Sequence, residues 1–192
     1  MKKPGIVLLI ILALGFTGAC STPPNEEMER AYDAVTRAEN DADAVTYASN
    51  TIVRARDALS RMQNEADAKH YDAAKTYAAD ALTQAERSIA EGKNAAVRAK
   101  SEAENLINSL ASPLTETASS LDAAWRTKKL ELDFDSLTAD MESAHRTYSD
   151  ARQSLQNSRY QEAINQGQTV RSLLSGINAA LTEGVQAVSR KQ

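Results

Sequence analysis

The chain has 192 residues, a formal net charge of −4, one cysteine and one tryptophan. This length suits one domain or two small ones. The acidic balance argues against a nucleic-acid binder, which needs a basic patch, and a lone cysteine has no disulfide partner within the chain.

The first residues have the parts of a bacterial export signal. Lys2 and Lys3 precede an apolar run of about eleven residues, within the usual length of a signal core. A bilayer-spanning helix needs about twenty apolar residues, so this run is too short to be a membrane span. Residues 1–19 are therefore expected to be a signal peptide, and its loss leaves a net charge of about −6.

The signal ends in two small residues followed by Cys20. This ending resembles the lipobox of bacterial lipoproteins, although Thr17 occupies the position where leucine is usual. The resemblance implies that Cys20 becomes the acylated N-terminus, and two or more acyl chains anchor a protein stably to a bilayer. The alternative is ordinary cleavage that leaves a free thiol. Since Ser21 is not aspartate, the resemblance places the protein at the outer membrane, facing the periplasm or the cell surface.

The rest of the chain favours helices throughout. Residues 20–25 contain Pro23 and Pro24 and form a short extended tether, and Pro113 is the only later proline. Alanine, glutamate, glutamine, arginine and lysine are abundant, and all favour helices. The sequence predicts an all-α fold, an elongated antiparallel bundle of coiled-coil hairpins whose core is built largely from alanine.

Apolar periodicity predicts six helices in chain order. The first covers 26–41, with Asn25 as its cap and a turn after it. The second covers 49–68, and its stripe steps by three and four as a coiled-coil seam does. The third is long, covering 71–111, although Gly92 could divide it. The fourth begins at Pro113, and the segment 128–135 is a loop or an extended helix end. The fifth begins near Asp135 or Ser136 and ends at a corner of residues 157–159, and the sixth begins at Tyr160 and extends to at least Val185. The stripe of the second helix is Ile52, Ala55, Leu59, Met62 and Ala66.

Proline fits the first position of a helix and not its interior, so Ser112-Pro113 is predicted to separate two units, 26–112 and 113–192. Helices two and three resemble helices five and six at an offset of 89 residues, with Tyr71 aligned to Tyr160. We therefore hypothesise a duplicated helical hairpin, giving two three-helix units. The alternative is that two alanine-rich hairpins align this well by chance.

The first half also contains a distinctive pattern of alanine and tyrosine residues. Ala44, Tyr47 and Ala48 form a turn, and the corner at Tyr71 is followed by a run of alanines. This pattern resembles an uncharacterised family of alanine-rich helical domains found in bacterial lipoproteins, over roughly 26–92. The resemblance implies a three-helix fold in an envelope lipoprotein, and it implies no activity.

The sequence contains no recognisable catalytic or metal-binding pattern. His70 and His145 lack partners at metal-ligand spacing, and the carboxylate pairs Glu102–Glu104 and Asp133–Asp135 are better explained as solvated faces or helix caps. We therefore predict no enzyme, no metal and no cofactor. Trp125 is the aromatic residue best suited to anchor a protein partner.

These observations lead to two expectations of function. The first is a structural or adaptor lipoprotein, held to the lipid bilayer by acylated Cys20, that binds another envelope component by helix docking. The second is a periplasmic small-ligand carrier with a cavity between the two helical units, near Trp125 and Phe134. The sequence does not indicate the oligomeric state.

Overall fold

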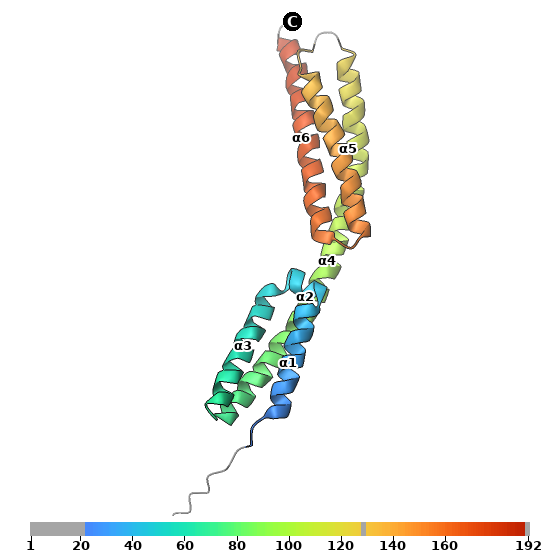
Figure 1. Cartoon of the computed structure of the whole chain (residues 1–192). Helices are drawn as coiled ribbons and strands as arrows, with labels where there is room; N and C mark the ends of the chain where they lie inside the picture. Colours follow the sequence, from blue (N-terminus) through green and yellow to red (C-terminus); the bar gives the residue numbers. More distant parts are fainter. Residues whose placement is uncertain (1–21, 128–129, 191–192) are drawn as a thin grey trace, which may run out of the picture.

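The computed structural model describes residues 22–127 and 130–190, and these form six α-helices without a β-strand. The prediction of an all-α bundle is confirmed. Figure 1 shows an elongated molecule in which two helical bundles are joined by one long helix. In chain order the helices are α1 (Asn25–Asn40), α2 (Ala42–Tyr47), α3 (Ser49–Asp67), α4 (Tyr71–Trp125), α5 (Phe134–Gln156) and α6 (Tyr160–Arg190).

Helix α4 belongs to both bundles. It has 55 residues, which corresponds to a length of about 80 Å at 1.5 Å per residue. Its N-terminal part packs with α1, α2 and α3, and its C-terminal part packs with α5 and α6. Among the described helices, no Cα of α1, α2 or α3 lies within 8 Å of a Cα in α5 or α6. The backbone of α4 is therefore the scaffold that both bundles share.

The first core cluster is built mainly from alanine, as expected. Small side chains bury little apolar area each, so this bundle depends on close approach along whole helices. The predicted seam of α3 faces this cluster, with Met62 as its largest fully buried side chain. The main members of the cluster are Ala31, Ala34, Val35, Ala38, Ala44, Ile52, Ala55, Ala58, Met62, Ala78, Ala81 and Ala85.

The second cluster uses larger side chains. It begins on α4 at Ala99 and includes Leu106, Ile107, Leu110, Leu114 and Leu121, with Met141 from α5 and Val170, Leu174 and Ile177 from α6. Along α4, the first cluster ends at Ala85 and the second cluster begins at Ala99.

Gly92 does not divide α4. A Cβ built on Gly92 would lie 2.5 Å from the backbone nitrogen of Ala44 and 2.6 Å from its Cα, so α2 rests directly on this position. The sequence predicted a turn after α1, and the structure has the short helix α2 there instead. Asp41 caps the start of α2, because its Oδ1 accepts a 2.8 Å hydrogen bond from the Ala44 nitrogen. The glycine thus permits helix contact and does not interrupt α4.

The predicted helix break at Ser112-Pro113 is wrong, because α4 continues through Pro113 to Trp125. Proline removes the amide that would bond to the carbonyl of Ser109, at a cost of about 3 kcal/mol. Ser109 is exposed, so water can reach that carbonyl, while Leu110 and Leu114 on either side are buried in the second cluster. Packing on both sides of the proline offsets the local cost. The division of the chain into units 26–112 and 113–192 stays a prediction.

The link between α4 and α5 is short, because α5 already begins at Phe134. Leu130 and Leu132 pack against the second cluster, and a Cβ on Gly184 would lie 2.8 Å from Leu132 Cδ2. The alternating leucines of this segment therefore cover the end of the bundle. The α1 cap also differs from expectation, since Pro24 occupies the N-cap position and Asn25 is the first helical residue.

The two hairpin corners have the same backbone geometry at the offset of 89 residues. Lys69 and Ser158 both adopt a left-handed conformation, with φ of 61° and 60°. In the first corner the His70 amide donates to the Glu65 carbonyl at 2.8 Å, and in the second the Arg159 amide donates to the Ser154 carbonyl at 2.9 Å. The hypothesis of a repeated hairpin predicts this match, whereas the exposed Trp125 has no equivalent in α1.

Candidate functional site

Cys20, the predicted lipidation site, lies outside the described residues. The described chain begins at one tip of the molecule, beside the start of α1 (Figure 1). There Pro24 is buried against the first bundle, and its carbonyl accepts a 3.0 Å hydrogen bond from the Met28 amide. Within the two described ranges, no helix is long and apolar enough to cross a membrane.

Trp125, the predicted partner-binding residue, lies at the opposite end of the molecule from Thr22, as the last residue of α4. Its side chain is 60% exposed, and its ring contacts Phe134 edge-on, with centroids 5.1 Å apart. The two aromatic residues therefore do not lie between the bundles, where the sequence placed them, because the continuous α4 carries them to the far end.

Trp125 borders a groove of about 440 Å³ between α4 and α5. Leu121 and Met141 form part of its lining, and Asp122, Glu142 and His145 contribute polar groups. Asp122 is paired with Arg126 at 2.8 Å, and Glu142 with Arg146 at 3.6 Å. The groove thus combines a large aromatic side chain, Trp125, with polar groups around it, which is typical of a protein-docking surface.

A second groove, of about 690 Å³, lies between the C-terminal parts of α4 and α6. Every side chain that lines it is uncharged: Ser120, Ala123, Ala124, Thr127, Leu130, Asn178, Leu181, Thr182, Val185, Gln186, Val188 and Ser189. Asn178 Nδ2 donates a 2.9 Å hydrogen bond to Oγ1 of the buried Thr117, which holds α6 against α4 at one end of this groove.

Only some of the candidate polar residues have structural partners among the described residues. His70 Nδ1 lies 2.8 Å from Glu65 Oε2 at the exposed α3–α4 corner, and His145 lines the groove beside Trp125. Asp133 Oδ1 accepts a 3.1 Å hydrogen bond from the Ser136 amide and so caps α5. In the parts of the chain that the structure describes, no group of three or more His, Cys, Asp or Glu side chains is placed to hold a metal ion.

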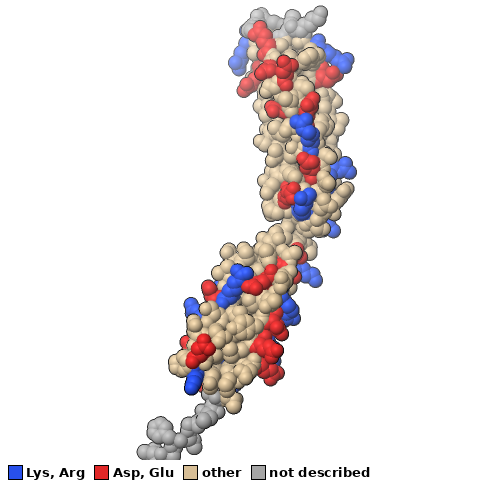
Figure 2. Space-filling view, in the orientation of Figure 1, with Lys and Arg blue, Asp and Glu red and all other residues tan. Residues whose placement is uncertain are grey.

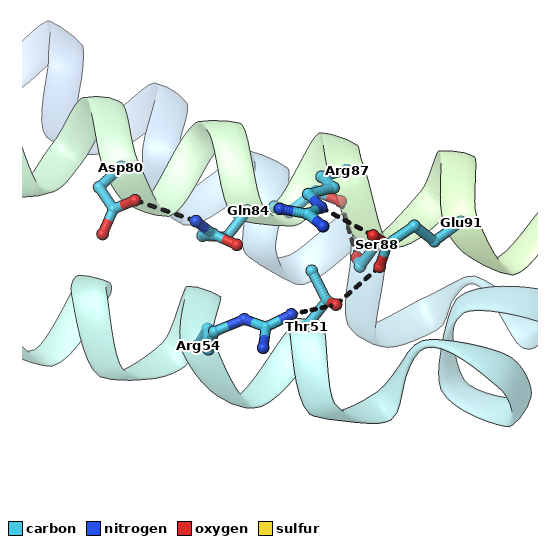
Figure 3. A network of polar contacts seen from close by, with 8 residues as sticks. Thr51, Arg54, Asp80, Gln84, Arg87, Ser88 and Glu91 are labelled. Carbon is cyan, nitrogen blue, oxygen red and sulfur yellow. Dashed lines mark hydrogen bonds and ion pairs between the residues drawn. The ribbon is translucent and has the colours of Figure 1, made fainter.

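A polar network that the sequence did not reveal joins α3 to α4 close to Gly92 (Figure 3). Thr51 is 3% exposed, and its hydroxyl donates to Glu91 Oε2 at 2.8 Å while accepting from Arg54 Nη2 at 2.8 Å. Arg87 Nε donates to the other oxygen of Glu91 at 2.7 Å. These bonds, first that from Thr51 and then that from Arg87, hold the pKa of Glu91 below its usual value.

Tyr47, at the end of α2, reaches from the first bundle toward the second. Among the described residues before Ala99, it is the one partly buried hydrophobic side chain that packs against the second cluster. Burial raises the pKa of its phenol, and Asp43 and Tyr160 add to the rise. The sequence identified Tyr47 only as part of a turn, since α2 itself was not predicted.

Charged side chains of both signs are interspersed over the two bundles on the face shown in Figure 2. This distribution is typical of a solvated surface, and it leaves the grooves of the second bundle as the main candidates for binding.

Comparison with known proteins gives one match. No curated protein and no solved structure is significantly similar to the chain. The model of an unknown-function family matches residues 26–106, which agrees with the expectation of an uncharacterised family and extends beyond Gly92 into the second bundle. A domain of unknown function (DUF4398) covers residues 26–106 of this chain.

Proposed function

We propose that the chain is a lipid-anchored, non-enzymatic adaptor of the bacterial cell envelope. Acylated Cys20 holds one end at the outer membrane, and the two bundles present helix faces to another envelope protein on the periplasmic side. The absence of aspartate at Ser21 supports the outer membrane as the destination, by resemblance to enterobacterial lipoproteins.

The observation that carries this proposal is the position of Trp125. It is a large aromatic residue, 60% exposed, beside a groove at the end of the molecule remote from Thr22. Exposed aromatic residues next to apolar grooves are common anchors of protein–protein interfaces. An adaptor needs its binding surface away from its tether, and the continuous α4 supplies that separation.

Photo-crosslinking in cells tests the adaptor directly. A photoreactive amino acid replaces Trp125 in one version of the full chain and Tyr32, an exposed aromatic residue of the first bundle, in a control version. We expect a discrete protein adduct from position 125 and none of the same mass from position 32. Absence of any adduct at 125, or identical adducts from both positions, would overturn the proposal.

A second candidate function is a carrier of small apolar ligands, which the uncharged 690 Å³ groove favours. Pockets that bind small molecules usually exceed about 300 Å³ and are mostly apolar. The neutral fluorescent probe N-phenyl-1-naphthylamine should then bind the protein, and Ala123→Trp should abolish binding by filling the groove. Ser175→Trp, at an exposed position of α6 outside the lining, is the matched control. A protein that does not bind the probe, or binding that Ala123→Trp leaves unchanged, would exclude this candidate.

A further inference from the structure

A third groove, of about 640 Å³, runs between α4 and α6 near the junction of the two bundles. Along α4 its lining extends from Arg98 to Ser109, and α6 contributes Gln168 and Arg171. Its floor includes Leu106, which a Cβ on Gly167 would approach to 2.8 Å, so the glycine brings α6 close to α4 at this level. The groove lies on the second bundle, away from Trp125 and from the first described residue.

Two arginines in this groove lack the partners that most other arginines have. Arg30, Arg87, Arg126, Arg146 and Arg159 each pair with a carboxylate three or four positions away in the sequence. In contrast, neither Arg98 nor Arg171 takes part in a hydrogen bond or ion pair among the described residues.

The sequence around Arg171 explains why its charge is free. Positions three and four away on either side are Gly167, Gln168, Leu174 and Ser175, none of them acidic. Arg98 has Glu102 four positions later, but the two side chains form no ion pair among the described residues. In a chain with a net charge of −4, these two guanidinium groups form a local excess of positive charge over the single carboxylate of the groove.

Neutral polar side chains lie between the two arginines. Ser101, Asn105 and Gln168 line the groove and make no hydrogen bond with another described residue. Carboxamide groups donate and accept hydrogen bonds as peptide groups do, so they suit a ligand with amide bonds. The eleven steps from Arg98 to Ser109 correspond to about 16 Å of helix, the length of about five residues of extended peptide.

We propose that this groove binds an acidic peptide in extended form. Arg171 and Arg98 accommodate carboxylates toward its two ends, since guanidinium groups bind carboxylates through paired hydrogen bonds. Asn105 and Gln168 bond the peptide groups between them. The site uses neither Cys20 nor Trp125, so a test of this site is independent of a test of the adaptor function.

Fluorescence anisotropy with a defined probe tests this site. The probe is an amidated pentapeptide with a rhodamine label, glutamate at both ends and alanine between; a second probe has glutamine at both ends. The protein is the full mature chain with Cys20→Ser, alone or with Arg98→Gln, Arg171→Gln or Arg152→Gln. Arg152 is the matched control, because it is exposed on α5 outside the groove and has no partner among the described residues.

We expect the glutamate probe to bind, and the Arg98 and Arg171 variants each to weaken its binding by up to about fivefold, as removal of exposed charge contacts does. Added salt should weaken binding further, because the contacts are screened. The Arg152 variant and circular dichroism of all variants should match the parent protein. The proposal is overturned by no binding up to about 1 mM, the weakest affinity of interest, by equal binding of the glutamine probe, or by an equal loss with Arg152→Gln.

Discussion

The Cβ position of Gly92 lies 2.5 Å from the backbone nitrogen of Ala44, a distance at which a methyl group cannot fit without movement. The backbone of α2 is thus seated on α4 between the two core clusters. Two features depend on this contact between α2 and α4. Tyr47 reaches the second cluster from the end of α2, and Thr51 of α3 forms a hydrogen bond with Glu91 of α4.

Gly92→Ala should destabilise the protein although alanine favours helices more than glycine does. The propensity gain is about 1 kcal/mol, and forcing α2 away from α4 costs about 1–3 kcal/mol. Urea unfolding should therefore show a net loss of up to about 2 kcal/mol.

Gly176→Ala is the matched control for that substitution. Gly176 lies within α6 and has no atom within 4 Å of a built Cβ. This change should raise the free energy of unfolding by up to about 1 kcal/mol. Equal stabilisation by both substitutions would show that α2 does not rest on Gly92.

Tyr47→Ala should widen the range of angles between the two bundles. No other partly buried hydrophobic side chain from α1–α3 packs on the second cluster among the described residues, so the substitution removes this contact and leaves α4 to set the angle. Spin labels at Asn64→Cys and Asp150→Cys, in a Cys20→Ser background, should report a broader distance distribution, with helix content unchanged. Tyr32→Ala is the control, and an unchanged distribution for Tyr47→Ala would mean that the stiffness of α4 suffices.

The Glu91 network predicts a specific dependence on pH. Because its hydrogen bonds lower the pKa of Glu91 in the folded state, its contribution is complete above the ordinary value of 4.5 and is lost as the pH falls through the folded pKa. Wild type should therefore lose stability more steeply than Glu91→Gln on acidification from pH 4.5. Parallel pH profiles of the two proteins in urea unfolding would contradict the network.

Pro113→Ala should stabilise the protein, because alanine restores the amide that bonds to the Ser109 carbonyl and favours the helix interior. The gain should be about 1–3 kcal/mol, since Pro113 is only half-buried and contributes little packing. Thermal unfolding monitored by circular dichroism measures the shift. A lower midpoint would indicate that the proline ring, and not the restored bond, matters at this position.

Local periodicity predicted the helices well. The hairpin corners at Lys69 and Ser158 fall where the sequence places them, because each corner interrupts a regular stripe of apolar residues. The continuity of α4 through Pro113 could not be predicted, because it depends on leucines whose partners lie on α5 and α6. The local preference of proline predicts a helix break at this position, and the tertiary packing of the leucines on either side outweighs that preference.

The candidate site was harder to predict than the fold. Trp125 was identified by its residue type, but its place at the tip follows from the length of α4. The bond between Thr51 and Glu91 joins residues 40 positions apart, so it leaves no short-range pattern in the sequence. The lack of acidic neighbours around Arg171 can be read from the sequence, but the groove that Arg171 shares with Arg98 depends on how α6 packs on α4.

The central claim is that Cys20 tethers the protein to a membrane, and mass spectrometry of the mature N-terminal peptide tests it most directly. The account predicts that the peptide begins at Cys20 and carries added acyl mass, and that Cys20→Ser lacks this mass and leaves the membrane fraction while keeping its helical circular dichroism. An unmodified thiol at Cys20, or a Cys20→Ser protein that still partitions with membranes, would contradict the account.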